Sequence, residues 1–326
     1  MQLKLTTAFC FIATAIFAQF PGPAQTAGST AIPKDSSIFV AWAANCHIDR
    51  GLQDVSTPSL GLATVGDSSM ALGIAGSNAV VSLGDGGSAI VTFSAPITNG
   101  PGFDFAVFEN AFNDTFLELA FVEVSSDGVN YFRFPATSNS PTSPQYGGSA
   151  VMDATKLNNL AGKYRALFGT PFDLQELTGI SQLNINAITH VKIIDVVGSI
   201  NTSYGTYDKN NTIINDPWPT PYASSGFDLD AVGVINQTVG IRELTDNSLF
   251  HIYPNPSRSE FKIERKGFGN PSFHYQIVNF LGIVVKEQSM VNNNVTEVEI
   301  SDLSTGLYFL YLQCEEKNWI YKVIKE

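Results

Sequence analysis

The sequence of 326 residues predicts an all-β protein: a large β-sandwich or jelly-roll-like domain with one short helix, followed by a small C-terminal β-sandwich. Short apolar runs bounded by Gly, Pro, Asn and Asp recur along the chain, as they do where strands end in tight turns. Helical spacing of apolar residues occurs in one segment. Many short strands with little helix are typical of sandwiches and jelly rolls.

The N-terminus predicts export. Lys4 precedes an apolar stretch from Ala8 to Ala18. This stretch is too short to span a bilayer but has the length of the apolar region of a secretory signal peptide. We therefore expect a signal peptide over residues 1–18, and no later apolar run is long enough to predict a membrane-spanning segment.

The large domain, residues 19–237, reads as a series of short strands. These are Ile38 to Trp42, Ala79 to Leu83, Ala89 to Phe93, Phe103 to Phe108, Phe116 to Val124, Tyr131 to Phe134, Ile188 to Val197 and Phe227 to Ile235. The segments 84–88 and 125–130 contain the glycines that hairpin turns require. Asp153 predicts the N-cap of the one helix, over residues 154–168, where apolar residues recur at helical spacing.

The large domain is acidic. Residues 19–237 contain 19 acidic and 8 basic side chains, a net charge of −11, whereas residues 241–326 contain 11 and 9. Such a domain repels nucleic-acid phosphate and anionic membranes, so we expect no nucleic acid among its partners. The acidity suits hard cations such as Ca²⁺, which choose oxygen ligands, and it is equally typical of a solvated acidic surface.

A short polar segment, residues 238–249, separates two β-patterned regions and predicts a linker. Just beyond it, Pro254 and Pro256 force the chain to turn, because each proline fixes its own φ and restricts the residue before it. Alternating apolar and polar residues follow from Phe261 onward. These features predict a second, small β-sandwich over residues 250–326.

Three runs in this region carry a resemblance to a known family. They are Phe250-His251-Ile252-Tyr253-Pro254-Asn255-Pro256-Ser257, the stretch from Leu303 to Leu312, and Lys322 to Glu326. They resemble the C-terminal sorting domain of type IX secretion cargo, a small β-sandwich. The resemblance implies that the type IX secretion machinery is a partner and that the protein is displayed on the outer cell surface. An ordinary C-terminal β-domain without an export role is the alternative.

The large domain carries a second resemblance. Its runs are Val81 to Ser88, Asn99 to Asn110, Leu117 to Gly128 and Gly226 to Gly233. They are similar to blocks that recur in a family of bacterial cell-surface proteins. The resemblance implies a β-sandwich at the cell surface, together with an association with surface loci for corrinoid uptake, and it implies no particular reaction.

Two segments share the pattern Gly-Phe-Asp followed by Ala-Val, and each places a carboxylate at the start of an apolar strand. An unpaired buried carboxylate is costly, so something should satisfy it. The first hypothesis is a structural Ca²⁺ ion ligated by Asp104, Glu109, Asp228 and Asp230. The alternative is that these carboxylates accept hydrogen bonds from turns or pair with Arg133, Lys192 or Arg165.

The segment from Gly198 to Gly226 is far longer than ordinary connections, and such segments are often functional. It contains aromatic side chains of the kind that stack on sugars or planar ligands: Tyr204, Tyr207, Trp218 and Tyr222. These residues form the predicted binding site for an unidentified surface ligand, possible classes being a glycan and a small planar molecule such as a corrinoid. Anchoring of Trp218 in the core by its flanking prolines is the alternative.

Motifs of known catalytic chemistry are absent from the sequence. His47 beside Cys46 lacks zinc-site spacing, and no Gly-x-Ser-x-Gly, His-Glu-x-x-His or phosphate-binding glycine loop occurs. Glu118 and Glu123 are a candidate carboxylate pair for a glycan hydrolase, although a β-rich domain with 19 acidic side chains offers such pairs by chance. We therefore expect a secreted, surface-displayed, non-catalytic binding protein, with a secreted glycan hydrolase or a purely structural surface protein as alternatives.

Overall fold

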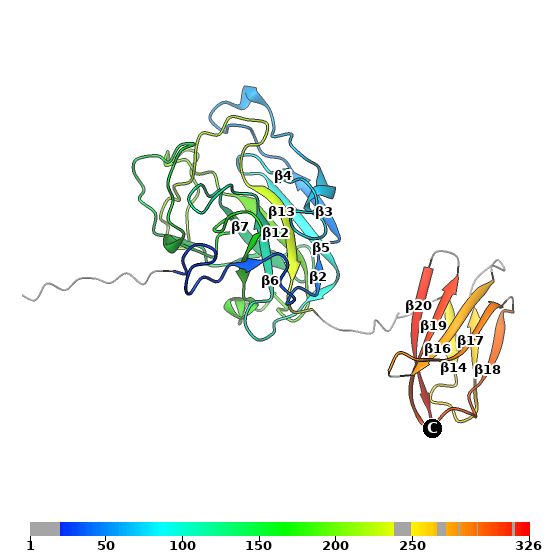
Figure 1. The fold of residues 1–326 in the computed structure, drawn as a ribbon. Helices are drawn as coiled ribbons and strands as arrows, with labels where there is room; N and C mark the ends of the chain where they lie inside the picture. The colour runs from blue at the N-terminus through cyan, green and yellow to red at the C-terminus, as the bar shows by residue number, and fades with distance from the viewer. Residues whose placement is uncertain (1–19, 238–248, 266–271, 280, 292, 315–316) are drawn as a thin grey trace, which may run out of the picture. The chain divides into compact units, whose positions relative to one another are not determined.

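The computed structural model describes residues 20–237, 249–265, 272–279, 281–291, 293–314 and 317–326 (Figure 1). The predicted signal peptide and residues 238–248 of the predicted linker lie outside these ranges. The chain divides into two compact units, Met1–Val239 and Gly240–Glu326. Within the described ranges, no helix has the length and apolar character needed to cross a membrane.

The first unit contains two large antiparallel sheets. One has the order β1 (Ile32–Pro33), β11 (Phe168–Phe172), β6 (Phe105–Glu109), β13 (Asp228–Val234) and β2 (Ala41–Trp42), and β4 (Val81–Ser82) also pairs with β13. The other has the order β3 (Asn45–Asp49), β5 (Ser88–Ile97), β12 (Ile188–Asp195), β7 (Ala120–Ser125) and β8 (Phe132–Arg133). A small extra sheet joins β9 (Thr137–Ser138) to β10 (Leu157–Asn158).

The two large sheets pack face to face over one hydrophobic core. Inward residues of β6 and β13, such as Val107 and Val232, belong to the same buried cluster as Val122 of β7 and Val191 of β12. Their neighbours point the other way, and Phe108 packs outside against other aromatic rings. This alternation is the period-2 pattern of strands buried on both faces. The all-β prediction is therefore confirmed (Figure 1).

The helix predicted over residues 154–168 is wrong. The helical segments of the first unit that the structure describes are 3₁₀ turns: η1 (Pro58–Leu60), η2 (Ser68–Ala71), η3 (Ala154–Lys156) and η4 (Leu174–Leu177). Asp153 does cap η3 by accepting the N–H of Thr155 at 2.9 Å. The helix stops there because its C-cap, Leu157, is extended and begins β10, and positive φ at Asn159, Gly162 and Leu167 interrupts the helical path beyond it. The strand β11 then begins within the segment predicted as helical.

The two predicted hairpin turns have different outcomes. Residues 125–130 do connect the paired strands β7 and β8, and Asp127 accepts the N–H groups of Val129 and Asn130. Residues 84–88 instead cross between sheets, because β4 pairs with β13 whereas β5 pairs with β3 and β12. The glycines of that segment still adopt positive φ, at Gly84 and Gly86. The turn prediction therefore holds locally, but the hairpin prediction is wrong.

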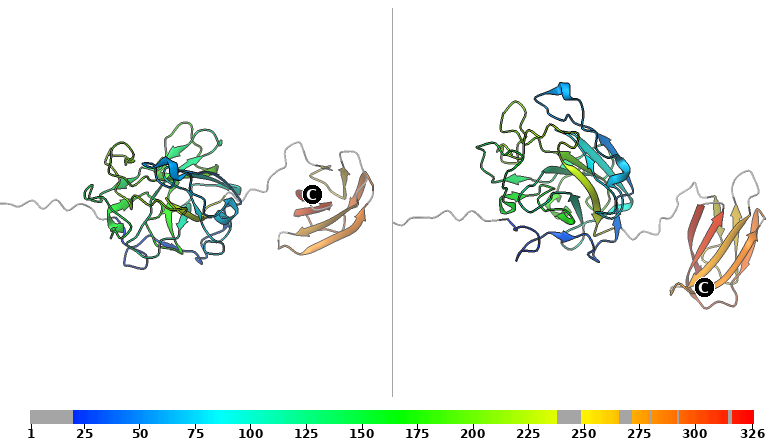
Figure 2. Two further views of the ribbon diagram at one scale, coloured as in Figure 1. Left: turned by 90° about the horizontal axis from the view of Figure 1, so that it is seen from above. Right: turned by 45° about the horizontal axis from the view of Figure 1, so that its top comes forward.

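The second unit is a smaller sandwich of two antiparallel sheets (Figure 2). One contains β14 (Phe250–Tyr253), β15 (Glu260–Arg265) and β18 (Val295–Glu299), in that order. The other has the order β17 (Val284–Val291), β16 (Phe273–Asn279), β19 (Gly306–Cys314) and β20 (Lys317–Lys325). The turn after β14 is tied to β20, because the N–H of Ser257 donates to the carbonyl oxygen of Ile324 at 2.9 Å.

Candidate functional site

At one end of the first sandwich, carboxylates replace the apolar side chains that point between the sheets. On β6, Phe105 and Val107 enter the core, and Glu109 occupies the next inward position. On β12, Ile193 enters the core, and Asp195 occupies the next inward position. Asp195 accepts the N–H of Phe227, which lies two residues before Leu229, the partner of Glu109, so the last inward residues of the two strands lie at the same end of the sandwich.

The strand β7 begins at the same end. Ala120 and Val122 point into the core, and Glu118 lies two residues before Ala120, so it shares their side of the chain. The connections 83–87, 110–119 and 196–227 all start or finish at this end. We call the resulting group the acidic end; its members are Asp85, Glu109, Glu118, Asp195, Asp216 and Asp228.

Asp195 joins two of these connections. Its Oδ2 accepts the N–H of Gly86 at 2.8 Å, and its Oδ1 accepts the N–H of Phe227 at 2.7 Å. Gly226 leaves no room for a side chain here, since a Cβ would lie 2.8 Å from Oδ1 of Asp195. Burial raises the pKa of Asp195 to about 7, and the hydrogen bond from Gly86 opposes that rise.

Two buried carboxylates of the acidic end are only half satisfied. Oε2 of Glu109 accepts the N–H of Ala111 at 2.7 Å, and Oδ2 of Asp216 accepts the N–H of Leu119 at 2.8 Å. The second oxygen of each, Oε1 of Glu109 and Oδ1 of Asp216, is buried and has no hydrogen-bond partner in the described structure. The side chains are 1% and 3% exposed, so solvent does not compensate.

Repulsion among these carboxylates adds to the effect of burial. The pKa of Glu109 is raised well above its ordinary value by burial first and by the neighbouring Glu118 second. The pKa of Glu118 is raised by burial and then by Asp228 and Asp195. Burial, Glu118 and Asp195 also raise the pKa of Asp216, against its hydrogen bond from Leu119. The acidic end therefore favours uptake of positive charge.

Asp228 lies at the edge of this group beside a cation. The hydroxyl of Ser82 donates to its Oδ1, and the guanidinium of Arg50 lowers its pKa, but burial dominates and raises the pKa to about 6. Arg50 itself donates to main-chain carbonyl oxygens, including that of Val65 at 2.8 Å. The positive charge of Arg50 therefore lies near Asp228, at the edge of the acidic end.

The carboxylates predicted to ligate Ca²⁺ occupy separate places. Glu109 and Asp228 both belong to the acidic end. Asp104 lies at the other end of β6 and accepts the N–H groups of Gly100 and Leu174 and the amide of Asn236. Asp230 sits at a register shift of β13 and accepts the N–H of Gly76 at 2.9 Å. Both Asp104 and Asp230 thus accept main-chain N–H groups of connecting segments.

The predicted aromatic residues lie on the connection 196–227, drawn in yellow-green in Figure 1. The rings of Tyr204 and Trp218 approach with centroids 6.1 Å apart at 33°. The indole N–H of Trp218 donates to Oδ2 of Asp85 at 3.1 Å, which ties the aromatic pair to the acidic end. Tyr222 is 67% exposed and Tyr207 is also exposed. Among the described residues, neither of these two rings forms a ring–ring contact with Trp218.

This long connection is anchored along its length. The side-chain amide of Gln145 donates to the carbonyl oxygens of Gly198 and Asp216, and its Oε1 accepts the N–H of Ile200. Asn215 donates to the carbonyl oxygens of Pro141 and Pro144 at 2.8 Å each. The segment is therefore an ordered part of the unit, although it contains no long strand.

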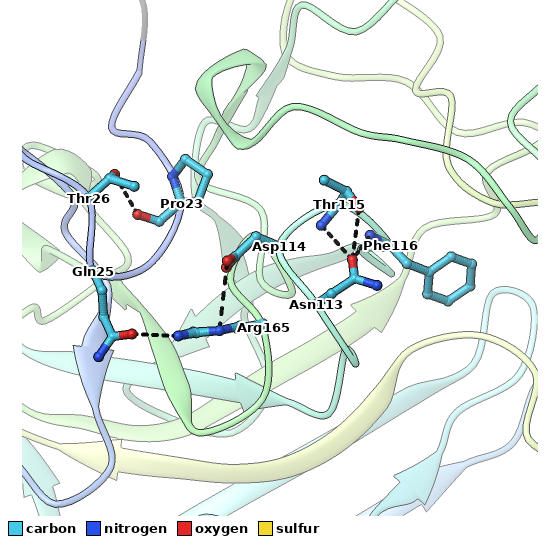
Figure 3. Close-up of polar contacts among 8 residues, drawn as sticks. All are labelled: Pro23, Gln25, Thr26, Asn113, Asp114, Thr115, Phe116 and Arg165. Carbon is cyan, nitrogen blue, oxygen red and sulfur yellow. Dashed lines mark hydrogen bonds and ion pairs between the residues drawn. The ribbon is translucent and has the colours of Figure 1, made fainter.

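A network of polar contacts holds the path of the connection 110–119 (Figure 3). Oδ1 of Asn113 accepts the N–H groups of Thr115 and Phe116 at 2.8 and 2.9 Å. Next to it, Arg165 donates to Gln25 at 2.6 Å and lies 3.7 Å from Asp114. Shallow grooves of about 460 Å³ and 320 Å³ flank these contacts. The network positions the chain that leads to Glu118.

The predicted hydrolase pair does not come together. Glu123 lies on the opposite side of its strand from Glu118, and it forms a salt bridge with Arg133 at 2.8 Å. Glu118 instead neighbours Glu109. The sequence analysis did not identify Asp85, Asp195 or Asp216 as site residues. Asp195 could have been identified, because it continues the alternation of inward-facing residues along β12.

One part of the chain matches a known protein family. Residues 251–326 match the family model of the secretion system C-terminal sorting domain. No curated protein matches the sequence.

Solved structures with some similarity include three that differ in kind. The first is a biofilm-associated protein BSP domain, with 10% identity, coverage of 73% of this chain and 48% of that chain, and a TM-score of 0.21. The second is a β-glucuronidase from Ruminococcus gnavus, with 8% identity, coverage of 87% of this chain and 44% of that chain, and a TM-score of 0.21. The third is a β-1,2-glucanase from Parabacteroides distasonis, with 10% identity, coverage of 73% of this chain and 30% of that chain, and a TM-score of 0.19. This chain spans less than half of each of them, and TM-scores this low carry no inference.

The match to the sorting domain agrees with the seven-stranded sandwich formed by β14 to β20, whose described residues fill nearly the whole matched range. That domain implies an interaction with the secretion machinery. Residues 251–326 are a type IX secretion C-terminal sorting domain, and the protein is exported for attachment to the outer cell surface or for release.

Proposed function

We propose that the first unit is a non-catalytic binding module displayed outside the cell, and that its ligand docks on the connection 196–227. The observation that carries this proposal is the aromatic pair of Tyr204 and Trp218, held in place by the hydrogen bond from Trp218 to Asp85. An aromatic face that is fixed before binding loses little conformational entropy when a ligand stacks on it. This favours a recognition surface over a mobile surface loop.

The chemistry of this connection defines the ligand class. Indole and phenol rings stack on the apolar faces of sugars and on flat conjugated molecules, whereas Asn and Asp side chains bond their polar edges. Tyr207 and Tyr222 extend the exposed aromatic surface of the same connection. The proposed ligand is a glycan or a small planar molecule such as a corrinoid.

Export places this surface where such ligands occur. The sorting domain provides passage across the outer membrane, and residues 1–18 are proposed as the signal peptide for the preceding step. The proposal therefore combines a carrier unit at the C-terminus with a recognition unit before it.

The test is a screen of the full chain against glycans and corrinoids, repeated with Trp218→Ala. We expect saturable binding that weakens at least about tenfold in the variant, since one stacked aromatic side chain contributes on the order of 1.5 kcal/mol or more. Phe112→Ala is the matched control, because Phe112 is an aromatic side chain 87% exposed on a different connection. Undiminished binding by Trp218→Ala would place the ligand elsewhere, and no saturable binding would favour a structural surface protein.

A second candidate is a glycan hydrolase, and one observation favours it. Glu118 is partly exposed, and its neighbour Glu109 is a buried carboxyl whose pKa is strongly raised, as general acids require. Turnover of glycans that disappears in Glu118→Gln would establish the hydrolase and end the non-catalytic proposal. Turnover that survives Glu118→Gln would exclude this pair.

A further inference from the structure

We propose that the acidic end binds a divalent metal ion of the calcium type, held by Glu109, Glu118 and Asp216 between the two sheets. The ion would join β6 of one sheet to the start of β7 in the other and to the connection 196–227. This inference does not rest on the proposed ligand of the aromatic pair, since the ion would be held by carboxylates and not by the aromatic rings.

The first argument is the pair of orphaned oxygens. Oε1 of Glu109 and Oδ1 of Asp216 are buried without hydrogen-bond partners, and the side chains that bear them are at least nine-tenths buried. Asp216 accepts the N–H of Leu119, the residue after Glu118, and Glu118 also raises the pKa of Glu109, so both carboxyls lie around Glu118 at the same end of the sandwich. A buried carboxylate oxygen without a donor is unfavourable. A cation in this region would satisfy both oxygens.

The second argument is the sign of the surrounding charge. The ionisable groups that act on Glu109, Glu118 and Asp216 are all carboxylates. The nearby cation, Arg50, acts on Asp228 at the rim. Elsewhere in the described structure, acidic groups such as Glu123 are paired directly with a basic side chain. The acidic end thus lacks compensation at its centre, where a bound ion would supply it.

The donor set selects the kind of ion. All members of the acidic end offer oxygen ligands, and neither His nor Cys belongs to it. A hard cation such as calcium prefers such a set, whereas zinc prefers nitrogen and sulfur ligands. In the described residues, no three His, Cys, Asp or Glu side chains are placed to hold an ion by themselves. Calcium accepts six to eight oxygens including water and carbonyl groups, so the two fixed carboxylates can begin its coordination shell, and Glu118 must move to add the third.

Glu118 is the member able to complete the site. Its side chain is partly exposed and makes no hydrogen bond in the described structure, whereas main-chain N–H groups, among them those of Ala111 and Leu119, fix Glu109 and Asp216. Rotation of Glu118 toward the two orphaned oxygens requires no bond to break. We therefore expect the ion to draw Glu118 inward and to retain some of its water.

The experiment measures thermal unfolding of the full chain in EDTA and in excess Ca²⁺, together with calorimetric titration of the metal. We expect Ca²⁺ to raise the midpoint of the first unit by about 5 °C or more at a hundredfold excess over its Kd. Glu109→Gln and Asp216→Asn keep an oxygen for the N–H of Ala111 or Leu119 but remove a charge. Both variants should unfold at a higher temperature than the wild type in EDTA and bind Ca²⁺ at least tenfold more weakly.

Asp35→Asn is the matched control, because Asp35 is an exposed carboxylate of the same unit outside the acidic end. It should retain the calcium response in full. A wild-type midpoint that Ca²⁺ leaves unchanged, with no heat of binding, would overturn the proposal. So would an equal loss of affinity in Asp35→Asn, or a loss in Asp104→Asn and Asp230→Asn with none in the two variants of the acidic end.

Terbium(III) provides a readout that depends on position. This ion replaces calcium at oxygen sites and emits when a nearby indole is excited, and Trp218 is bonded to Asp85 of the acidic end. We expect indole-sensitised emission that Ca²⁺ displaces and that Trp218→Phe, measured at saturating terbium, reduces severalfold. Emission that is unchanged in Trp218→Phe would place the ion away from the acidic end.

Discussion

The indole N–H of Trp218 donates to Oδ2 of Asp85 at 3.1 Å, and the same oxygen accepts the N–H of Val55 at 2.9 Å. One carboxylate oxygen therefore connects the long connection 196–227 to the segment before β4. Asp85 is buried, and burial raises its pKa while these two donors lower it. The position of the aromatic pair thus depends on an acid that belongs to the carboxylate group beneath it.

Loss of this hydrogen bond should be measurable without a ligand. Trp218→Phe retains an aromatic ring but leaves Asp85 with one donor fewer, so we expect the first unit to lose about 1.5 kcal/mol of unfolding free energy. Urea unfolding measures it. Tyr222→Phe, which removes an exposed hydroxyl from the same connection, should change stability by less than about 0.5 kcal/mol. Equal effects of the two substitutions would contradict a specific role for the bond.

Gly162 should tolerate no side chain, because it passes against the main chain before β7. A Cβ there would lie 1.7 Å from the carbonyl oxygen of Glu118, and φ is +77°. We expect Gly162→Ala to destabilise the first unit by more than about 3 kcal/mol. Gly28 has nearly the same φ, +76°, with nothing within 4 Å of its Cβ position. Gly28→Ala should cost about 1 kcal/mol. Comparing the thermal unfolding of the two variants separates the effect of backbone strain at positive φ, which both share, from that of the steric clash, which only Gly162→Ala has.

Lys163 should make the stability of the first unit rise with pH in the alkaline range. Burial lowers its pKa from 10.5 to about 8, and its Nζ donates to the carbonyl oxygen of Leu157 at 2.8 Å. Between these two values the unfolded chain binds more protons than the folded chain, so stability increases as pH rises. Lys163→Met should flatten that part of the urea-unfolding profile. A profile parallel to the wild type would show that Lys163 does not titrate there.

Cys46 should react slowly while the first unit is folded. Burial raises the pKa of its thiol from 9.0 to about 11, which lowers the thiolate fraction at pH 8 about a hundredfold. Alkylation by iodoacetamide should therefore be about a hundred times slower in native than in urea-unfolded protein. In protein that lacks residues 1–18, and with them Cys10, Cys46→Ser leaves Cys314, which is buried in the second unit, as the reference thiol. Similar native and unfolded rates at Cys46 would contradict the prediction.

Deletion of residues 250–326 should retain the first unit in the periplasm, because it removes every strand of the sorting domain. Protease shaving of intact cells measures the exposed fraction. Full-length Trp218→Ala serves as the control and should remain at the surface, since its change lies in the other unit. Equal surface exposure of the deletion and the full chain would show that export does not require this domain.

The alternation of apolar residues was sufficient to predict the fold class and most of the long strands. The strands β5, β7, β12 and β13 lie within or close to their predicted ranges, because each alternates between the core and an outer layer. The predicted helix failed because its apolar residues serve different clusters: Leu157 and Leu160 pack in one, whereas Ala161 packs in the main core. Helical spacing of apolar residues indicates that several of them are buried, but it does not show whether they pack in the same hydrophobic cluster.

The candidate site was predictable in part for a related reason. Glu109 and Asp228 stand at strand ends that the sequence indicates, and they do lie in one group. Asp104 has the same sequence context as Asp228, yet it lies at the start of β6, at the far end of the sandwich from Glu109. Asp216 belongs to no strand and reaches the group through a connection whose path depends on tertiary hydrogen bonds. Local patterns carry no information about such a path.

The tie between Ser257 and β20 has a consequence for how the second unit can come apart. The nine residues of β20 pair along β19. At the end of β20, the carbonyl oxygen of Ile324 accepts the N–H of Ser257, and the N–H of Glu326 donates to the carbonyl oxygen of Ser257. The edge of β19 and the turn after β14 therefore depend on one strand, so detachment of β20 would uncover both sheets at once.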